Sequence, residues 1–132
     1  MTVVLTGTGL TLDEVVRVAR AGARVELAPA AVENMRASRG VVEQALQSGQ
    51  QVYGFSTGVG MRKRFAIEED QARFNRQLIR GHLVGQGPPA PADAVRATLL
   101  KLANGLAQGF AGVRPELAQL VVDRLNEGVT PR

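Results

Sequence analysis

Val52-Tyr-Gly-Phe-Ser-Thr-Gly-Val-Gly60 is the stretch around which the rest of this chain is organised. It places the phenol of Tyr53, the only tyrosine in the sequence, inside a glycine-rich loop. A helical pattern stops just before the loop at Gly49, and another begins just after it near Ile67, so rigid elements should display the loop and leave it free to move. The sequence therefore predicts a loop that can close over a substrate.

The composition of this loop is also compatible with a purely structural role. Gly54, Gly58 and Gly60 can supply positive φ angles in tight turns, and Tyr53 would then be an ordinary half-buried aromatic residue. The loop by itself leaves both interpretations open.

Length and composition indicate one soluble domain. The chain has 132 residues, of which 45% are hydrophobic, and no apolar run long enough to span a membrane. It has no cysteine, which excludes disulfides and thiolate metal sites, and no secretory signal pattern, so a cytoplasmic location is the expectation. The net charge of +4 comes mostly from dispersed arginines, which disfavours a nucleic-acid interface.

Hydrophobic periodicity predicts a mainly α fold of amphipathic helices with a small N-terminal β element. Val3–Leu5 and Arg24–Leu27 are predicted as two short strands that pair with each other. The predicted helices run from the capping box Thr11-Leu-Asp-Glu14 to about Ala21, from Pro29 to Gly49, from Ile67 to the break at Gly81-His-Leu-Val-Gly85, from Ala92 to about Gln108, and from Pro115 to about Asn126.

Four of these helices carry apolar stripes that should face a core. The third helix should also begin with Glu68, Glu69 and Asp70, because acidic side chains favour the positive N-terminal end. The predicted inward residues are Val32, Met35, Val42 and Leu46; Ile67, Gln71, Phe74, Leu78 and His82; Val95, Leu99, Leu102 and Leu106; and Leu117, Leu120, Val121 and Leu125.

Ordered motifs along the chain resemble those of the histidine and aromatic amino acid ammonia-lyases and their aminomutase relatives. Residues 53–60 are similar to the family's Tyr-Gly-x-Asn-Thr-Gly-x-Gly loop, and residues 76–87 to its Asn-Leu-[Val/Ile]-x-Ser-His-x-x-Gly-x-Gly segment. Residues 102–115 look like its Arg-x-Asn-x-Leu-x-x-Gly-x-Ser-Gly-[Val/Ile]-Arg-Pro segment, and residues 125–131 match the next one. The resemblance covers nearly the whole chain, which is therefore identified as a member of the family.

The resemblance implies that residues 1–132 form a single N-terminal segment of an ammonia-lyase-like domain, without the electrophile-forming region and the C-terminal helical bundle. The family builds its electrophile, a methylidene-imidazolone (MIO), from Ala-Ser-Gly, a tripeptide that does not occur in this chain. The chain is thus expected to be a fragment, or one subunit of a split enzyme, that is inactive alone. The expected partners are a second chain carrying the electrophile, further copies in a homo-oligomer, or both.

The same resemblance implies roles for individual residues. Tyr53 matches the tyrosinate that removes a β-proton from the amino acid whose amine adds to the electrophile. His82 is in register with a histidine that lines the pocket for the substrate side chain, and Leu83 and Gly60 are assigned to substrate binding with it. The expected substrate is histidine or an aromatic amino acid, and the reaction is either loss of the amine or its migration.

Apart from the resemblance, a structural role stays open for His82. A single histidine at the end of an apolar stripe is compatible with a hydrogen-bonded structural residue, and it has no sequence partner for a zinc site, so no metal is expected.

Several positions depart from the family pattern. Ser56 stands in place of the usual Asn, Val59 of an aromatic residue, Gly81 of Ser, Leu102 of Arg and Ala111 of Ser. Some of the replaced side chains are polar groups that would support a site. A second functional class therefore stays open, a noncatalytic relative whose helices bind a partner or scaffold an assembly.

Overall fold

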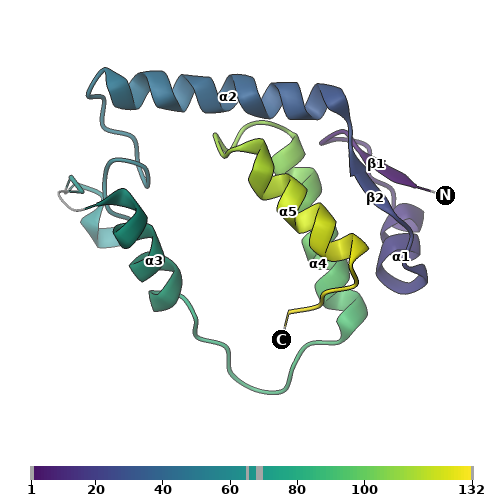
Figure 1. The fold of residues 1–132 in the computed structure, drawn as a ribbon. Helices are drawn as coiled ribbons and strands as arrows, with labels where there is room; N and C mark the ends of the chain where they lie inside the picture. Colours follow the sequence, from purple (N-terminus) through teal and green to yellow (C-terminus); the bar gives the residue numbers. More distant parts are fainter. Residues whose placement is uncertain (1, 65, 68–69, 132) are drawn as a thin grey trace. The chain divides into compact units, whose positions relative to one another are not determined.

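The computed structural model describes residues 2–64, 66–67 and 70–131. The chain divides into two compact units (Figure 1). Unit 1 comprises Met1–Val41 and Pro89–Arg132, and unit 2 comprises Val42–Pro88. The regular structure of the described chain is mostly helical, with one small sheet near the N-terminus, so the predicted mainly α fold is confirmed.

The sheet of unit 1 consists of the strands β1 (Val3–Leu5) and β2 (Val25–Leu27). They pair in parallel, with Val3 opposite Val25 and Leu5 opposite Leu27. A parallel pair needs a crossover connection, and helix α1 (Leu12–Ala21) supplies it. Both predicted strands and their pairing are confirmed, although β2 begins at Val25.

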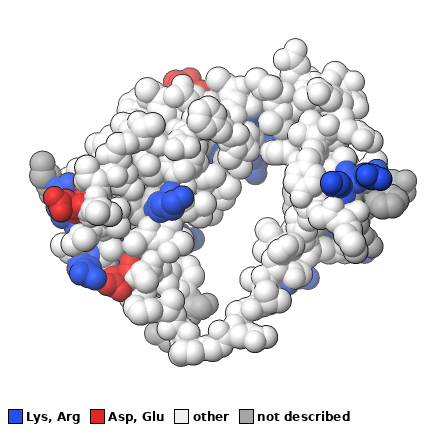
Figure 2. Space-filling view, turned by 180° about the vertical axis from the view of Figure 1, so that it is seen from behind, with Lys and Arg blue, Asp and Glu red and all other residues white. Residues whose placement is uncertain are grey.

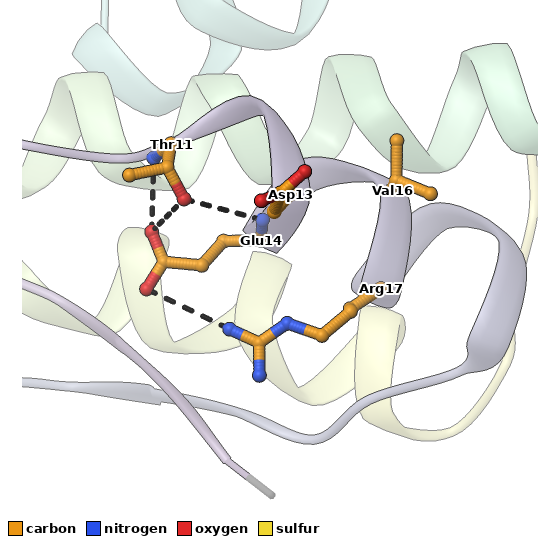
Figure 3. Close-up of a pocket in the computed structure, with 5 residues that line it drawn as sticks. All are labelled: Thr11, Asp13, Glu14, Val16 and Arg17. Atoms are coloured by element: carbon orange, nitrogen blue, oxygen red, sulfur yellow. Dashed lines mark hydrogen bonds and ion pairs between the residues drawn. The ribbon is translucent and has the colours of Figure 1, made fainter.

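Helix α1 begins and ends where its sequence signals predict. The Thr11 hydroxyl accepts a hydrogen bond from the Glu14 N–H at 3.3 Å, and a Glu14 carboxylate oxygen accepts one from the Thr11 N–H at 2.9 Å (Figure 3). Gly22 ends the helix with a left-handed φ of 66°. These contacts satisfy backbone groups that a helix end leaves without partners inside the helix.

The capping carboxylate gives the fold a pH-dependent contribution to stability. The backbone N–H of Thr11, and then its hydroxyl, lower the pKa of Glu14 below its ordinary value. Glu14 therefore stabilises the fold above its ordinary pKa, and this stabilisation is lost as the pH falls through the lowered value. We expect Glu14→Gln to lower Tm at neutral pH and to have little effect in acid, as measured by thermal unfolding over a pH series. The same Tm difference throughout the series would contradict this assignment.

The core of unit 1 lies where helices α4 (Ala92–Ala107) and α5 (Pro115–Asn126) meet α1 and the sheet. In Figure 1, α4 and α5 run side by side. Small residues on both helices, Ala103 and Ala118, are fully buried and let the backbones approach closely. The residues of the core cluster are Val3, Leu5, Val18, Val25, Leu100, Ala103, Val122 and Leu125.

Polar side chains complete this packing at helix ends. The Arg96 guanidinium donates hydrogen bonds to the Val18 carbonyl at 2.9 Å and to the Leu125 carbonyl at 3.1 Å. Both carbonyls lie in the last turn of a helix, where no partner inside the helix exists. The Asn126 side chain accepts a hydrogen bond from the Val25 N–H at 2.8 Å and donates one to the Val25 carbonyl at 2.9 Å. Arg96 and Asn126 thereby tie α1, α5 and β2 together.

Some predicted inward positions in α4 and α5 are wrong. Leu102, Leu117 and Leu120 are 48%, 45% and 49% exposed. The faces that are buried instead contain Leu100, Ala103 and Ala107 on α4 and Ala118, Val122 and Leu125 on α5. The prediction gave weight to leucine and valine, whereas close helix packing selected a neighbouring face that is rich in alanine. Among the other inward positions of these helices, Leu125 is buried, and Val95, Leu99, Leu106 and Val121 are half-buried.

Helix α2 (Pro29–Gln47) begins at the predicted proline, and Gly49, with a φ of 75°, follows its end. Met35 is buried as predicted, whereas Val32, Val42 and Leu46 are half-buried.

Helix α3 (Gln71–Gly81) begins four residues later than the predicted start at Ile67. Asp70 is the N-cap, because its carboxylate accepts hydrogen bonds from the N–H groups of Ala72 at 3.3 Å and Arg73 at 3.2 Å. Ile67 instead donates its N–H to the Ser56 carbonyl at 3.0 Å and so belongs to the preceding loop. Glu68 and Glu69, which were expected to begin the helix, lie outside the described residues.

Charged side chains are scattered over the face drawn in Figure 2, and some basic groups lie beside acidic ones. Ion pairs include Arg20 with Asp93 at 3.0 Å and Arg124 with Glu127 at 2.8 Å. The Arg20 guanidinium, followed by the Ala94 N–H, lowers the pKa of Asp93. Within the described ranges, no helix combines the length and apolar character that a membrane span requires.

Candidate active site

The Tyr53 loop is shaped by a tight turn within unit 2. The Val52 carbonyl accepts hydrogen bonds from the N–H groups of Phe55 at 3.0 Å and Ser56 at 2.9 Å. The Ser56 hydroxyl in turn accepts a hydrogen bond from the Val52 N–H at 2.8 Å. Gly54, with a φ of 73°, provides the left-handed conformation inside this turn. Ser56, which departs from the family pattern, therefore closes the turn that carries Tyr53.

The far side of the loop is held by a short antiparallel pairing. Thr57 forms an isolated β-bridge with Ala66. The Thr57 side chain is only 3% exposed, and its hydroxyl donates a hydrogen bond to the Gly58 carbonyl at 3.1 Å. The loop then continues into a 3₁₀ turn, η1 (Gly60–Arg62). These contacts all lie within unit 2 and give the loop a defined shape.

The Tyr53 phenol lies on the surface of this loop and is held at its hydroxyl. Its side chain is 62% exposed, and the hydroxyl oxygen accepts a hydrogen bond from the Gly60 N–H at 3.2 Å. A backbone N–H donor stabilises negative charge on an oxygen. The structure thus joins two of the predicted site residues, Tyr53 and Gly60, by a direct hydrogen bond.

A shallow apolar hollow lies next to this part of the loop. It is lined by Val59, which directly precedes Gly60, by Leu78 and Ile79 near the end of α3, and by His82 and Leu83, which follow that helix. Leu78 and Ile79 lie in the last turn of α3, His82 is its C-cap, and Leu83 follows directly and donates its N–H to the Arg80 carbonyl at 3.2 Å. His82 and Leu83 are therefore brought together at one apolar surface, whereas Tyr53 itself does not line the hollow.

His82 makes a structural contact through one of its two ring nitrogens. Its backbone caps α3, and its Nδ1 lies 2.7 Å from the Leu78 carbonyl oxygen. A carbonyl can only accept, so Nδ1 carries the hydrogen, and in the neutral ring Nε2 is left as an acceptor. The structural role considered for His82 thus coexists with the ability to accept a hydrogen bond at the hollow.

The sequence interpretation missed part of the lining. The sequence analysis noted Val59 only as a departure from the family pattern and predicted Leu78 to be a core residue. It did not single out Ile79. The available signal was the cluster of large apolar residues at positions 78, 79 and 83 around His82, at the predicted end of the helix. Among the described residues there is no group of His, Cys, Asp and Glu side chains that could hold a metal ion.

The chain belongs to the aromatic amino acid lyase family, whose model matches residues 10–132. It is 42% identical to a histidine ammonia-lyase of Treponema denticola and 44% identical to one of Streptomyces griseus, in each case over 98% of this chain and 26% of the relative. The chain therefore spans about a quarter of the length of these relatives.

Solved structures show the same fold. The ergothionase of Treponema denticola, in complex with desmethyl-ergothioneine sulfonic acid, superposes with a TM-score of 0.96 at 34% identity, covering 100% of this chain and 27% of that one. A tyrosine aminomutase from Streptomyces globisporus gives a TM-score of 0.91 at 30% identity, covering 99% of this chain and 25% of that one. The fold expected from the resemblance, that of the N-terminal part of the ammonia-lyases and aminomutases, is confirmed.

Proposed function

We propose that this chain supplies the base and part of the substrate pocket of an ammonia-lyase or aminomutase that acts on histidine or an aromatic amino acid. The observation that carries the proposal is the Tyr53 hydroxyl, which is exposed, hydrogen-bonded to Gly60 and carried by the same loop as Val59 at the edge of the hollow. Relatives that are histidine ammonia-lyases and a tyrosine aminomutase support this class of substrate.

In the proposed reaction Tyr53 accepts a proton at its hydroxyl oxygen from the β-carbon of the amino acid. A tyrosine in water is protonated at neutral pH, so a donor such as the Gly60 N–H is needed to favour the charged oxygen. The turn closed by Ser56 positions the phenol, and closure of the loop would exclude water during the proton transfer.

The family's methylidene-imidazolone, when present, activates the amine for departure. The described residues fit an approach by such a group, because the Tyr53 ring is exposed and not packed into its own unit. The tripeptide that forms the group is absent from this chain. We therefore propose that it comes from a partner chain or from a further segment of the protein.

The hollow suggests how the substrate side chain is recognised. Its walls are apolar except for His82, whose Nε2 can accept a hydrogen bond when Nδ1 donates to the Leu78 carbonyl. An imidazole N–H or a phenol O–H can donate to this acceptor, whereas a phenylalanine ring cannot. We propose that His82 and Leu83 contact the side chain of the substrate.

The experiment that tests the proposed function compares the chain alone with the chain in an assembly. The partner is a polypeptide comprising the part of the Treponema denticola histidine ammonia-lyase that follows the matched segment. Ammonia and unsaturated acid release, and amine migration, are followed with histidine, tyrosine and phenylalanine, while light scattering reports size. We expect no turnover from the chain alone and turnover from the assembly, because Tyr53 can accept a proton but nothing in the chain can activate the amine.

Turnover by the isolated chain would contradict the shared site. If the chain is a monodisperse monomer and does not bind the electrophile-bearing partner, the noncatalytic class is favoured instead. The chain would then be a helical partner-binding or assembly subunit.

His82→Phe should change substrate preference in the assembled enzyme. The substitution removes the only nitrogen acceptor in the wall of the hollow and keeps an aromatic ring. We expect kcat/KM for histidine and tyrosine to fall by about tenfold relative to phenylalanine, the effect of one lost hydrogen bond. Equal changes in kcat/KM for all three amino acids would indicate that His82 has only its structural role at the end of α3.

A further inference from the structure

Ser56 bonds to residues at both ends of the Tyr53 loop. At the start of the loop, its hydroxyl accepts the Val52 N–H at 2.8 Å and donates a longer hydrogen bond to the Gln50 carbonyl at 3.5 Å. Its own N–H donates to the Val52 carbonyl at 2.9 Å, and its carbonyl accepts the Ile67 N–H at 3.0 Å at the end of the loop. A single residue thus connects the two ends of the loop.

Two of these contacts depend on the type of residue at position 56. The backbone contacts are available to any residue there, whereas only a side chain with an oxygen at short reach can accept the Val52 N–H. Val52 is the residue directly before Tyr53. Without the Ser56 hydroxyl, the Val52 N–H would lose the hydrogen bond that fixes its direction, and the backbone that leads into Tyr53 would be less restrained.

The Tyr53 phenol depends on this restraint because packing does not fix it. Its side chain is 62% exposed, and its hydroxyl accepts the Gly60 N–H at 3.2 Å. The same two turns approach each other at a second point, since a Cβ on Gly54 would lie 3.7 Å from Cγ1 of Val59. Ser56 lies between the two turns in the chain, so its hydrogen bonds help to set the shape that brings the phenol to Gly60.

We infer that Ser56 is a positioning residue for the proton transfer by Tyr53, and that it acts through the hydrogen bond between its hydroxyl and the Val52 N–H. The inference rests on the proposed function. It also gives a role to the departure from the usual Asn at this position. A hydroxyl and an amide oxygen can each accept a hydrogen bond from an N–H, so serine can serve there with a shorter side chain. This departure therefore does not favour the noncatalytic class.

The test uses two substitutions that have the same shape and differ in the hydroxyl. Ser56→Thr keeps an oxygen for the Val52 N–H, whereas Ser56→Val has a methyl group in its place. Ser56→Ala removes the hydroxyl without adding an atom, and it serves if the turn does not accept a β-branched residue. The matched control is Ser48→Ala, because the Ser48 hydroxyl donates to the Ala45 carbonyl of α2 at 2.9 Å and lies outside the loop.

Steady-state kinetics of the assembled enzyme measure the effect on the reaction. We expect Ser56→Val to lower kcat by about tenfold to a hundredfold and to leave KM within about threefold, as for a misplaced catalytic group. Ser56→Thr and Ser48→Ala should keep both constants within about threefold of the unmodified assembly. Circular dichroism and light scattering verify the fold and the size of each assembly. Full kcat in Ser56→Val or in Ser56→Ala would overturn the inference.

A fluorine signal reports the position of Tyr53 independently of catalysis. Tyr53 is the only tyrosine, so fluorotyrosine incorporated into the chain gives an NMR signal from that ring alone. In the chain alone, we expect the chemical shift in Ser56→Thr to match that of the unmodified chain. The shift in Ser56→Val and Ser56→Ala should move towards the value of the urea-unfolded chain. An unchanged shift in both would contradict the inference, whether or not the assembly turns over.

The outcome is separable from that of the proposed function. If Tyr53→Phe abolishes turnover while Ser56→Val retains full kcat, Tyr53 stands as the base and the positioning role is wrong. If Tyr53→Phe retains full activity, the proposed base is wrong, and the positioning role is rejected with it even where the fluorine signal changes.

Discussion

Tyr53→Phe should lower kcat of the assembled enzyme by about a hundredfold to ten-thousandfold, the usual contribution of a general base. The variant keeps the aromatic ring and loses only the oxygen that accepts the β-proton. It also loses the hydrogen bond from the Gly60 N–H at 3.2 Å, which lies on the surface of the loop. Steady-state kinetics with histidine and tyrosine, on assemblies of verified size, measure the effect. Near-normal turnover would reject Tyr53 as the base.

A second measurement separates a chemical role of Tyr53 from a structural one. Because Tyr53 is the only tyrosine in the chain, fluorotyrosine incorporated into this chain labels that position alone. Fluorination makes a phenol more acidic, so the acidic limb of the pH profile of kcat/KM should move to lower pH if Tyr53 is the base. A residue that only shaped the loop would not move this limb.

Gly7→Ala should destabilise unit 1 by about 3 kcal/mol or more, a large share of the roughly 5–15 kcal/mol that stabilises a typical domain. Gly7 has a φ of 90°, and a Cβ there would lie 2.7 Å from the Gln108 nitrogen and 2.9 Å from the Ala107 carbonyl carbon. Both are backbone atoms at the end of α4 and cannot rotate away. The Gly7 N–H also donates to the Asn104 side chain at 3.1 Å, a contact that a shift of the backbone would break.

Gly9→Ala is the matched control for this substitution. Gly9 also has a positive φ, of 72°, but a Cβ there would meet nothing within 4 Å. Gly9→Ala should lower the free energy of unfolding only by the cost of the left-handed backbone conformation, about 1–2 kcal/mol. Urea unfolding of both variants gives the comparison. If both variants lose the same unfolding free energy, the close approach of Gly7 to α4 does not explain the destabilisation by Gly7→Ala.

The parts of the fold that depend on local chemistry were predictable. The Thr11 and Glu14 capping box, Gly22 after α1 and Pro29 at the start of α2 all act within a few residues of themselves, and the structure confirms each. The glycines of the Tyr53 loop were likewise recognised as residues that can supply positive φ angles in tight turns. Gly54 has the positive φ that such a turn requires.

The errors concern choices that depend on distant residues. Helix α3 was predicted to begin at Ile67 but begins at Gln71, because the Ile67 N–H donates a hydrogen bond to the Ser56 carbonyl across the loop. Local helix preference does not reveal this contact. The exposed Leu102 and Leu117 occupy helix faces that looked fit for a core. Each helix had more than one apolar face, and only the neighbouring elements decided which one was buried.

The sequence by itself determined the order of the elements, their caps and the motifs that mark the family, because hydrogen bonds and dihedral preferences within a few residues set these features. Only the tertiary structure showed that Arg96 donates to carbonyls at two helix ends and that Asn126 bonds to strand β2. It also decided the hydrogen bond from Gly60 to Tyr53 and the hollow shared by Val59 and His82. These contacts join residues whose separation along the chain says nothing about their distance in space, and only packing fixes that distance.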